Sequence, residues 1–137
     1  MLHDLLDCLA AAPGIITAMD FEQLCDWAAD EVAMIVKVLP DEIRSGAELC
    51  TVSYEDRPDE DEEDVEGDVL GLFEGASLIE EPDPDAMPRI RIFVGNLWEF
   101  AERDEQDFRD EVGTTFLHEL GHFLGWDEDE VAERGLE

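Results

Sequence analysis

The sequence predicts an α+β domain, with helices toward both ends of the chain and short strands between them. Three observations lead to this prediction. Apolar residues after residue 20 recur with helical spacing, the segment 89–95 alternates arginines with apolar β-formers, and the final third returns to helical spacing. The chain has 137 residues, of which 45% are hydrophobic, and this is the size and apolar content of one compact core. We therefore expect a single domain over residues 1–137.

The N-terminal segment predicts a short amphipathic helix over residues 2–11, within an extension that covers residues 1–19. It lacks the positively charged start of a signal peptide, and Asp4 and Asp7 interrupt its apolar part. No stretch of the chain approaches the roughly 20 apolar residues that a membrane span needs. We expect a cytoplasmic protein with no membrane partner.

The next segment predicts a longer helix that Asp20 caps and Pro40 bounds. Its apolar positions keep helical spacing, and they are Phe21, Leu24, Trp27, Ala28, Val32, Ile35 and Val36. The sequence PDEIRSG then indicates a helical turn that ends at Gly46. Residues 47–54, AELCTVSY, are rich in β-formers and predict a strand.

The middle of the chain alternates predicted loops and extended segments. Residues 57–68 read RPDEDEEDVEGD, which predicts an acidic loop in solvent, because the spacing lacks the glycine and glutamate of a calcium-binding EF-hand loop. Residues 69–79 indicate extended structure broken by glycines, and residues 80–88 another loop. RIRIFVG, residues 89–95, gives the clearest strand pattern.

The final third predicts a helix that Asp104 caps and Gly125 ends. Its expected core face has a strict spacing of four and consists of Phe108, Val112, Phe116, Leu120 and Leu124. Asp127, with Glu130 three residues later, offers a capping box for a last short helix over residues 128–134.

The charge of the chain is strongly negative. Thirty-nine acidic residues face eight Lys or Arg, which gives a formal net charge of −31. A surface of this sign repels phosphates, so we expect no nucleic-acid partner. The field could attract basic peptides or cations, or the acids could reflect adaptation to salt-rich cells. Because the acids are spread along the whole chain, we favour adaptation.

The cysteines predict free thiols. Cys8, Cys25 and Cys50 are odd in number, widely spaced and outside any paired-ligand motif. A disulfide framework or a thiolate zinc site is therefore not expected.

The segment HELGHFLGWDE, residues 118–128, carries the pattern of a zinc hydrolase. Positions four apart lie one above the other on a helix, so His118 and His122 can bind one ion at about 2.0–2.1 Å. Glu119 would lie beside a zinc-activated water as its general base. We predict a zinc site with Glu119 as the catalytic residue.

A catalytic zinc usually has three protein ligands. Gly125 can adopt the left-handed conformation that turns the chain back at a helix end, so that an acid three residues later approaches the ion. We expect Glu128 as the third ligand. Asp127 is the rival, although it is also the expected cap of the last helix.

HELGHFLGWDE resembles the extended HExxHxxGxx(D/E) signature of a family of small zincin-like metallopeptidases, found mainly in bacteria. FEQLCDWAADEV looks like the family's opening helix, GLFEG like its Gly-aromatic-Glu-Gly element, and RIRIFVGNLWEFA like the strand before its active-site helix. DEVGTTFLHELGHF is the most specific part, and together these segments cover residues 20–134. The resemblance implies a minimal zincin-like fold, in which a small mixed sheet packs against the HExxH helix with supporting helices. It also implies His118, His122 and Glu128 as metal ligands and Glu119 as the base, although the family usually has aspartate at position 128.

Other roles remain open. Strand 89–95 could be an edge strand that binds peptide backbone, or it could be central. Tyr54 and His3 are the only spare tyrosine and histidine that could stabilise an oxyanion, and the sequence places neither. We expect Trp98 and Trp126 to close the core beside the site.

Two function classes follow. The first is a zinc-dependent peptidase that acts on a peptide or protein substrate, basic peptides among them. The second is a metal-binding regulatory or interaction protein without turnover. A metal-dependent RNA hydrolase is disfavoured by the net charge and by the absence of a basic stripe.

Overall fold

The computed structural model describes residues 20–62, 65–81, 85 and 87–125. Along this part of the chain the elements are α3 (Phe21–Val38), α4 (Asp41–Leu49), β1 (Thr51–Glu55), β2 (Gly71–Glu74), β3 (Arg89–Phe93), α5 (Val94–Phe100) and α6 (Glu105–Phe123). The predicted helices over residues 2–11 and 128–134 lie outside the described residues. The α+β class is confirmed.

The three strands form a mixed sheet in the order β1-β3-β2. Strand β1 runs parallel to β3, with Val52 opposite Ile90, and β2 runs antiparallel to it, with Gly71 opposite Ile92. The predicted strand at 89–95 is therefore the central one, and β2 is an edge strand. This order decides between the two roles that the sequence left open for RIRIFVG.

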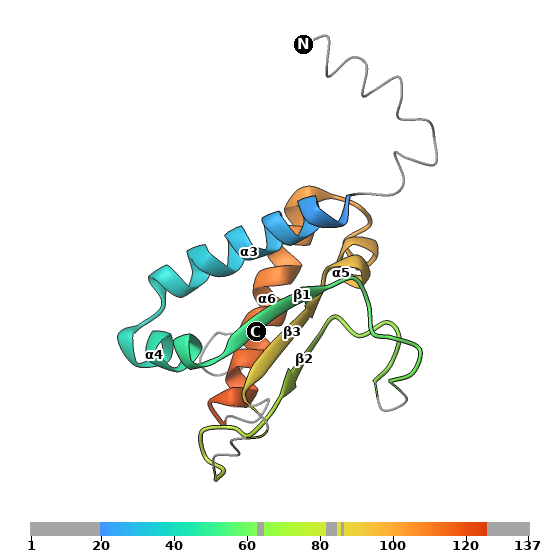
Figure 1. The fold of residues 1–137 in the computed structure, drawn as a ribbon. Helices are drawn as coiled ribbons and strands as arrows, with labels where there is room; N and C mark the ends of the chain where they lie inside the picture. The colour runs from blue at the N-terminus through green and yellow to red at the C-terminus, as the bar shows by residue number, and fades with distance from the viewer. Residues whose placement is uncertain (1–19, 63–64, 82–84, 86, 126–137) are drawn as a thin grey trace, which may run out of the picture.

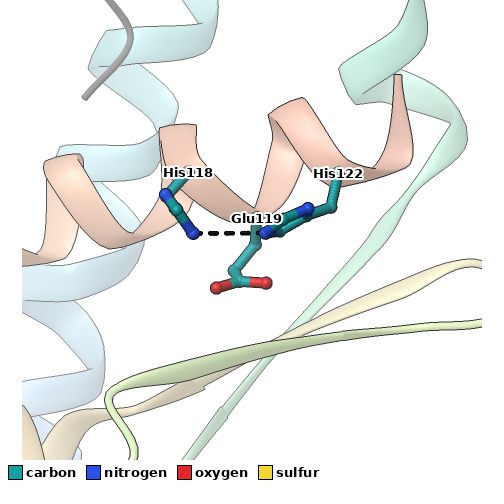
Figure 2. A group of neighbouring side chains, drawn as sticks. All are labelled: His118, Glu119 and His122. Atoms are coloured by element: carbon teal, nitrogen blue, oxygen red, sulfur yellow. Dashed lines mark hydrogen bonds between the residues drawn. The ribbon is translucent and has the colours of Figure 1, made fainter. Parts of the chain in front are cut away.

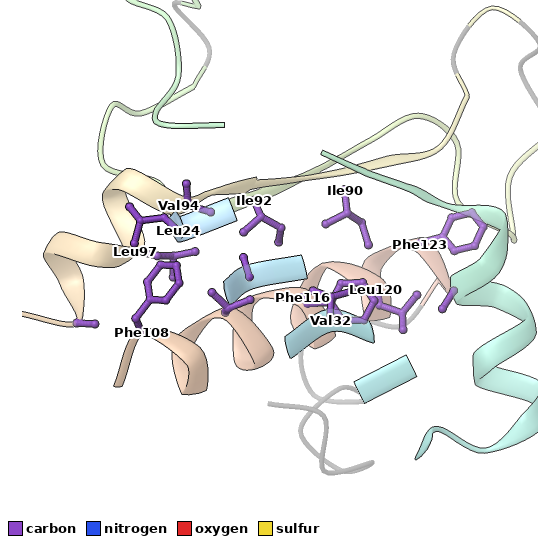
Figure 3. Packing of buried hydrophobic residues seen from close by; sticks show 14 of the residues in the cluster. Leu24, Val32, Ile90, Ile92, Val94, Leu97, Phe108, Phe116, Leu120 and Phe123 are labelled. Atoms are coloured by element: carbon purple, nitrogen blue, oxygen red, sulfur yellow. The ribbon is translucent and has the colours of Figure 1, made fainter. Parts of the chain in front are cut away.

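The helices cover one face of the sheet. Figure 1 shows α3 and α6 packed on the same side, with α6 running behind the three strands. Ile90 and Ile92 point to this side and are fully buried, and Figure 3 shows them facing Phe116 and Leu120 of α6 across the core. None of the helices in the described part of the chain has the length and hydropathy of a membrane span.

Helix α6 begins and ends close to the predicted residues. The Asp104 side chain accepts a hydrogen bond from the Asp107 backbone N–H at 2.9 Å, and Gly125 has a φ of +84° just beyond the helix. Phe123, rather than the predicted Leu124, is the last fully buried residue of the core face. A strict spacing of four drifts around a helix of 3.6 residues per turn, so a spacing of three restores the buried face.

The boundary at Gly46 was predicted wrongly. Helix α4 continues through it to Leu49, and β1 starts only at Thr51. Gly46 is buried, and a Cβ there would lie 2.7 Å from Cδ2 of Leu124. The glycine thus allows close packing within a helix, and it does not end one.

The end of the predicted strand at 95 was also too late. Strand β3 stops at Phe93, and the sequence analysis missed α5, which starts at once with Val94. The backbone N–H of Gly95 donates to the Asp56 carbonyl at 2.9 Å, and this bond ties the start of α5 to the residue that follows β1.

Arg91 lies on the sheet face opposite the helices, where it is nearly buried. It donates to both carboxylate oxygens of Glu55 at 2.8 and 2.9 Å, to both of Glu62 at 2.7 and 3.0 Å, and to Glu74 at 3.0 Å. The predicted solvated loop over 57–68 is therefore anchored to the sheet through Glu62. A buried arginine can hold several carboxylates because its guanidinium offers five donors.

Cys25 and Cys50 are free thiols, as predicted, and Cys8 lies outside the described residues.

Candidate metal centre

His118 and His122 occupy adjacent turns of α6 and face one another across a short gap. Their Nε2 atoms are 3.1 Å apart, and the two rings meet nearly edge to face with an interplanar angle of 83°. Figure 2 shows both rings on the same side of the helix. The i, i+4 spacing alone accounts for this pairing.

The separation of the two nitrogens fits a shared metal ion. Two ligands at 2.0–2.1 Å from a tetrahedral zinc lie about 3.3 Å apart, which is close to the observed 3.1 Å. The donor set is also suitable, because imidazole nitrogen is a preferred zinc ligand. The two histidines therefore lie close enough together to share one zinc ion, and their role as ligands stays a prediction.

Glu119 brings a carboxylate to the same place. One ligand atom from each of His118, Glu119 and His122 lies within 4.8 Å of the others, and all three residues are half-buried. Figure 2 shows the Glu119 carboxylate extending from the helix toward the strands, on the side to which the rings point. A carboxylate in this position can exchange a proton with a group held between the two rings.

Two of these side chains, Glu119 and His122, line a pocket between α6 and β2. Its volume is about 820 Å³, within the usual range for ligand sites. The described residues that line it are Gly71, Leu72, Phe73, Gly75, Ser77, Ile79, Glu80, Glu119, His122 and Gly125. Hydrophobic side chains and the acids Glu80 and Glu119 thus surround this space.

The segment after β2 completes the wall near the end of α6. The backbone N–H of Leu78 donates to the Phe123 carbonyl at 2.8 Å, and Ile79 packs against the backbone of Gly125. Glu80 is oriented by the Ser77 backbone N–H, which donates to it at 2.8 Å and lowers the pKa of its carboxyl. The sequence analysis did not include these residues in the site. GLFEG was the available signal, because it marks the strand that faces the HExxH helix.

The proposed third ligand is not described. Glu128 and its rival Asp127 both lie outside the described residues, and so does Trp126. The left-handed φ of Gly125 shows that the chain does turn at the predicted residue. The choice between the two acids stays a prediction.

Two aromatic residues lie away from the pocket. Tyr54 is on β1, at the opposite side of β3 from β2, and burial raises the pKa of its hydroxyl to about 12. Trp98 packs against Trp27 and Phe108, with ring centroids 6.0 and 5.8 Å away. Phe108 is ten residues before His118, roughly 15 Å along the helix, so the prediction that Trp98 lies beside the site is wrong.

The family comparison agrees with this arrangement. A family model described as zincin-like metallopeptidase matches residues 47–136, which is more than half of the chain. The matched region contains the sheet, the pocket wall and the HExxH helix, and it begins after α3. A comparison with curated proteins finds no match. Because the match covers more than half of the chain, the chain belongs to the zincin-like metallopeptidase family.

Proposed function

We propose that this protein is a zinc-dependent peptidase that cleaves peptide bonds with Glu119 as general base. The observation that carries this proposal is the clustering of ligand atoms from His118, Glu119 and His122 within 4.8 Å of one another, where Glu119 and His122 line a pocket beside the edge strand β2. Family membership supports the same reaction class. Free thiols at Cys25 and Cys50 agree with a cytoplasmic location, which is part of the proposal.

In this proposal His118, His122 and Glu128 hold the zinc ion. When bound, zinc supplies a Lewis acid that lowers the pKa of a coordinated water and polarises the substrate carbonyl. Glu119 accepts a proton from the attacking water and delivers it to the departing amine. The separation of roles follows from helix geometry, because Glu119 is the residue after the first ligand and points toward the strands.

The substrate is proposed to bind in extended form along β2. The Phe93 backbone N–H donates to the Leu70 carbonyl at 3.0 Å, and in an antiparallel ladder such hydrogen-bonded pairs alternate with pairs that are not bonded. Gly71 and Phe73 therefore direct their backbone N–H and carbonyl groups away from β3, to the outer edge of the described sheet. These groups can pair with a peptide backbone by β-addition.

The negative charge of the pocket suggests which peptides would bind there. Glu80 and Glu119 are the charged side chains among the described residues that line the pocket, and the chain as a whole carries −31. Such a field favours basic peptides over acidic ones, and it disfavours nucleic acid.

A second candidate is a metal-binding regulatory or interaction protein without turnover. One observation favours it. No Tyr, Lys or Arg is among the described residues that line the pocket, so none of these side chains is seen there to stabilise an oxyanion. Metal binding would be the same in both candidates, and only turnover separates them.

The test compares peptide hydrolysis by the zinc-loaded protein and its Glu119→Gln variant, across a mixed peptide library. The peptidase proposal predicts cleavage that falls about 10²- to 10⁴-fold in the variant while zinc content stays equal. Glu105→Gln, in the exposed first turn of the same helix, is the matched control and should cleave at the wild-type rate. Equal products from Glu119→Gln and wild type, or none from either with zinc bound, would remove the catalytic proposal.

A further inference from the structure

Gly71 is the point at which the edge strand meets the active-site helix. It is the first residue of β2, it is buried, and it lines the same pocket as Glu119 and His122. A Cβ built on Gly71 would overlap the Cγ2 methyl of Thr115 and would lie 3.5 Å from Cγ of Glu119. The backbone of β2 thus approaches α6 more closely than any other residue type would allow.

Neither side of this contact can move easily. Thr115 lies one turn before Glu119 on α6, is 8% exposed, and as a β-branched residue has few rotamers in a helix. On the other side, β2 is held by its pairing with β3, and the Arg91 carbonyl would lie 3.3 Å from the added Cβ. A side chain at position 71 must therefore push β2 away from α6.

We infer that Gly71 is a positioning residue: its missing side chain, set against Thr115, determines the gap between the edge strand and the Glu119 carboxylate. This inference rests on the proposed peptidase function and deepens it. Substrate held on β2 and a base held on α6 belong to different elements, so their separation depends on the closest contact between those elements. A misplacement of about 1 Å can lower the rate of a positioned reaction by about 10²-fold.

The contact suggests a rescue experiment. Gly71→Ala introduces the overlap, and Thr115→Ser removes the methyl that it meets while keeping the hydroxyl. The double variant should restore the gap. Gly113→Ala is the matched control, because it is a buried glycine on the same helix whose added Cβ would meet only the flexible end of Ile35, at 2.9 Å.

Four zinc-loaded variants are compared with wild type for kcat, KM, zinc content and thermal unfolding. Gly71→Ala should lower kcat about 10²-fold with zinc content unchanged, Thr115→Ser should lower it less than about tenfold, and the double variant should recover to within about tenfold of wild type. Gly113→Ala should keep the wild-type kcat. A wild-type kcat for folded Gly71→Ala, or a double variant as slow as Gly71→Ala, would overturn the inference.

Crystal structures of Gly71→Ala and the double variant give a readout that needs no activity. The Cα–Cα distance between residues 71 and 119 should increase in the first and return to the wild-type value in the second. If wild type cleaves no peptide, the proposed function fails, and the two structures alone then decide the inference. An unchanged distance in Gly71→Ala would overturn it.

Discussion

Two charged clusters lie on opposite faces of the same small sheet, and they hold their carboxylates in different ways. On the face away from α3 and α6, Glu55, Glu62 and Glu74 surround Arg91, a cation that the chain itself provides. On the face covered by α6, Glu119 lies with His118 and His122, whose Nε2 atoms are 3.1 Å apart, close enough to share a metal ion.

The first cluster uses one of the few basic residues of this acidic protein. The chain has eight Lys or Arg against thirty-nine acids, and Arg91 is buried among three of those acids. Its bonds to Glu55 and Glu62 lower the pKa values of both carboxyls, with that of Glu62 reaching about 2. The Arg91 cluster joins all three strands and the acidic loop, so we assign it to stability. The histidine cluster is carried by one helix, and its members Glu119 and His122 line a pocket, as the proposed peptidase function requires.

The largest expected effect concerns zinc affinity. Loss of an outer-shell partner of a metal ligand typically costs 10- to 100-fold in affinity, so His122→Ala, which removes a proposed ligand, should cost more than about 100-fold. Its metal-free stability should change by less than about 1 kcal/mol, because His122 is only half-buried. Zinc titration followed by chelator competition measures the affinity.

The same titration tests the third ligand: if Asp127→Ala abolishes binding and Glu128→Ala does not, the assignment of Glu128 is wrong.

The second effect is on folding. Arg91→Met leaves three carboxylates together without their cation, and breaking a buried ion pair in this way costs about 3–5 kcal/mol. Arg89→Met is the matched control: its side chain is 44% exposed and pairs with Glu74 at 2.6 Å, so it should cost less than about 1 kcal/mol. Urea unfolding of both variants at one salt concentration gives the comparison. Similar losses in the two variants would contradict a special role for Arg91.

The smallest effect is a pH dependence. The pKa of Glu62 is about 2 in the folded protein, below its ordinary value near 4.5, so its stabilising contribution is present above about pH 4.5 and is lost as the pH falls toward 2. Wild type should therefore lose its advantage over Glu62→Gln across this range. Glu60→Gln, in the exposed part of the same loop, makes the same charge change and should show no such convergence. Parallel curves for wild type and Glu62→Gln in urea unfolding at pH 5, 4, 3 and 2 would exclude the anchor role.

Local patterns predicted much of the fold. The caps at Asp20 and Asp104, the turn at Gly125 and the strand that begins at Arg89 all follow from residues that act on their immediate neighbours. The roles of two glycines were predicted less well. Gly46 was taken for a helix end and Gly71 for a break in extended structure, and both instead permit close packing against α6 or the residues that follow it. A glycine in the sequence indicates that a Cβ is disfavoured at that position. It does not tell whether the reason is the backbone conformation of the glycine itself or close packing against a residue distant in sequence.

The sequence by itself determined the alignment of His118, Glu119 and His122, because their spacing within one helix places them without reference to the rest of the chain. Only the tertiary structure decided that β2 is the edge strand beside them, that Arg91 gathers acids from three segments, and that Gly71 sets the gap to Glu119. The physical reason is the distance along the sequence between the residues that interact. Helix geometry is set over four residues, whereas strand order and side-chain neighbours depend on contacts between residues tens of positions apart, which no local pattern records.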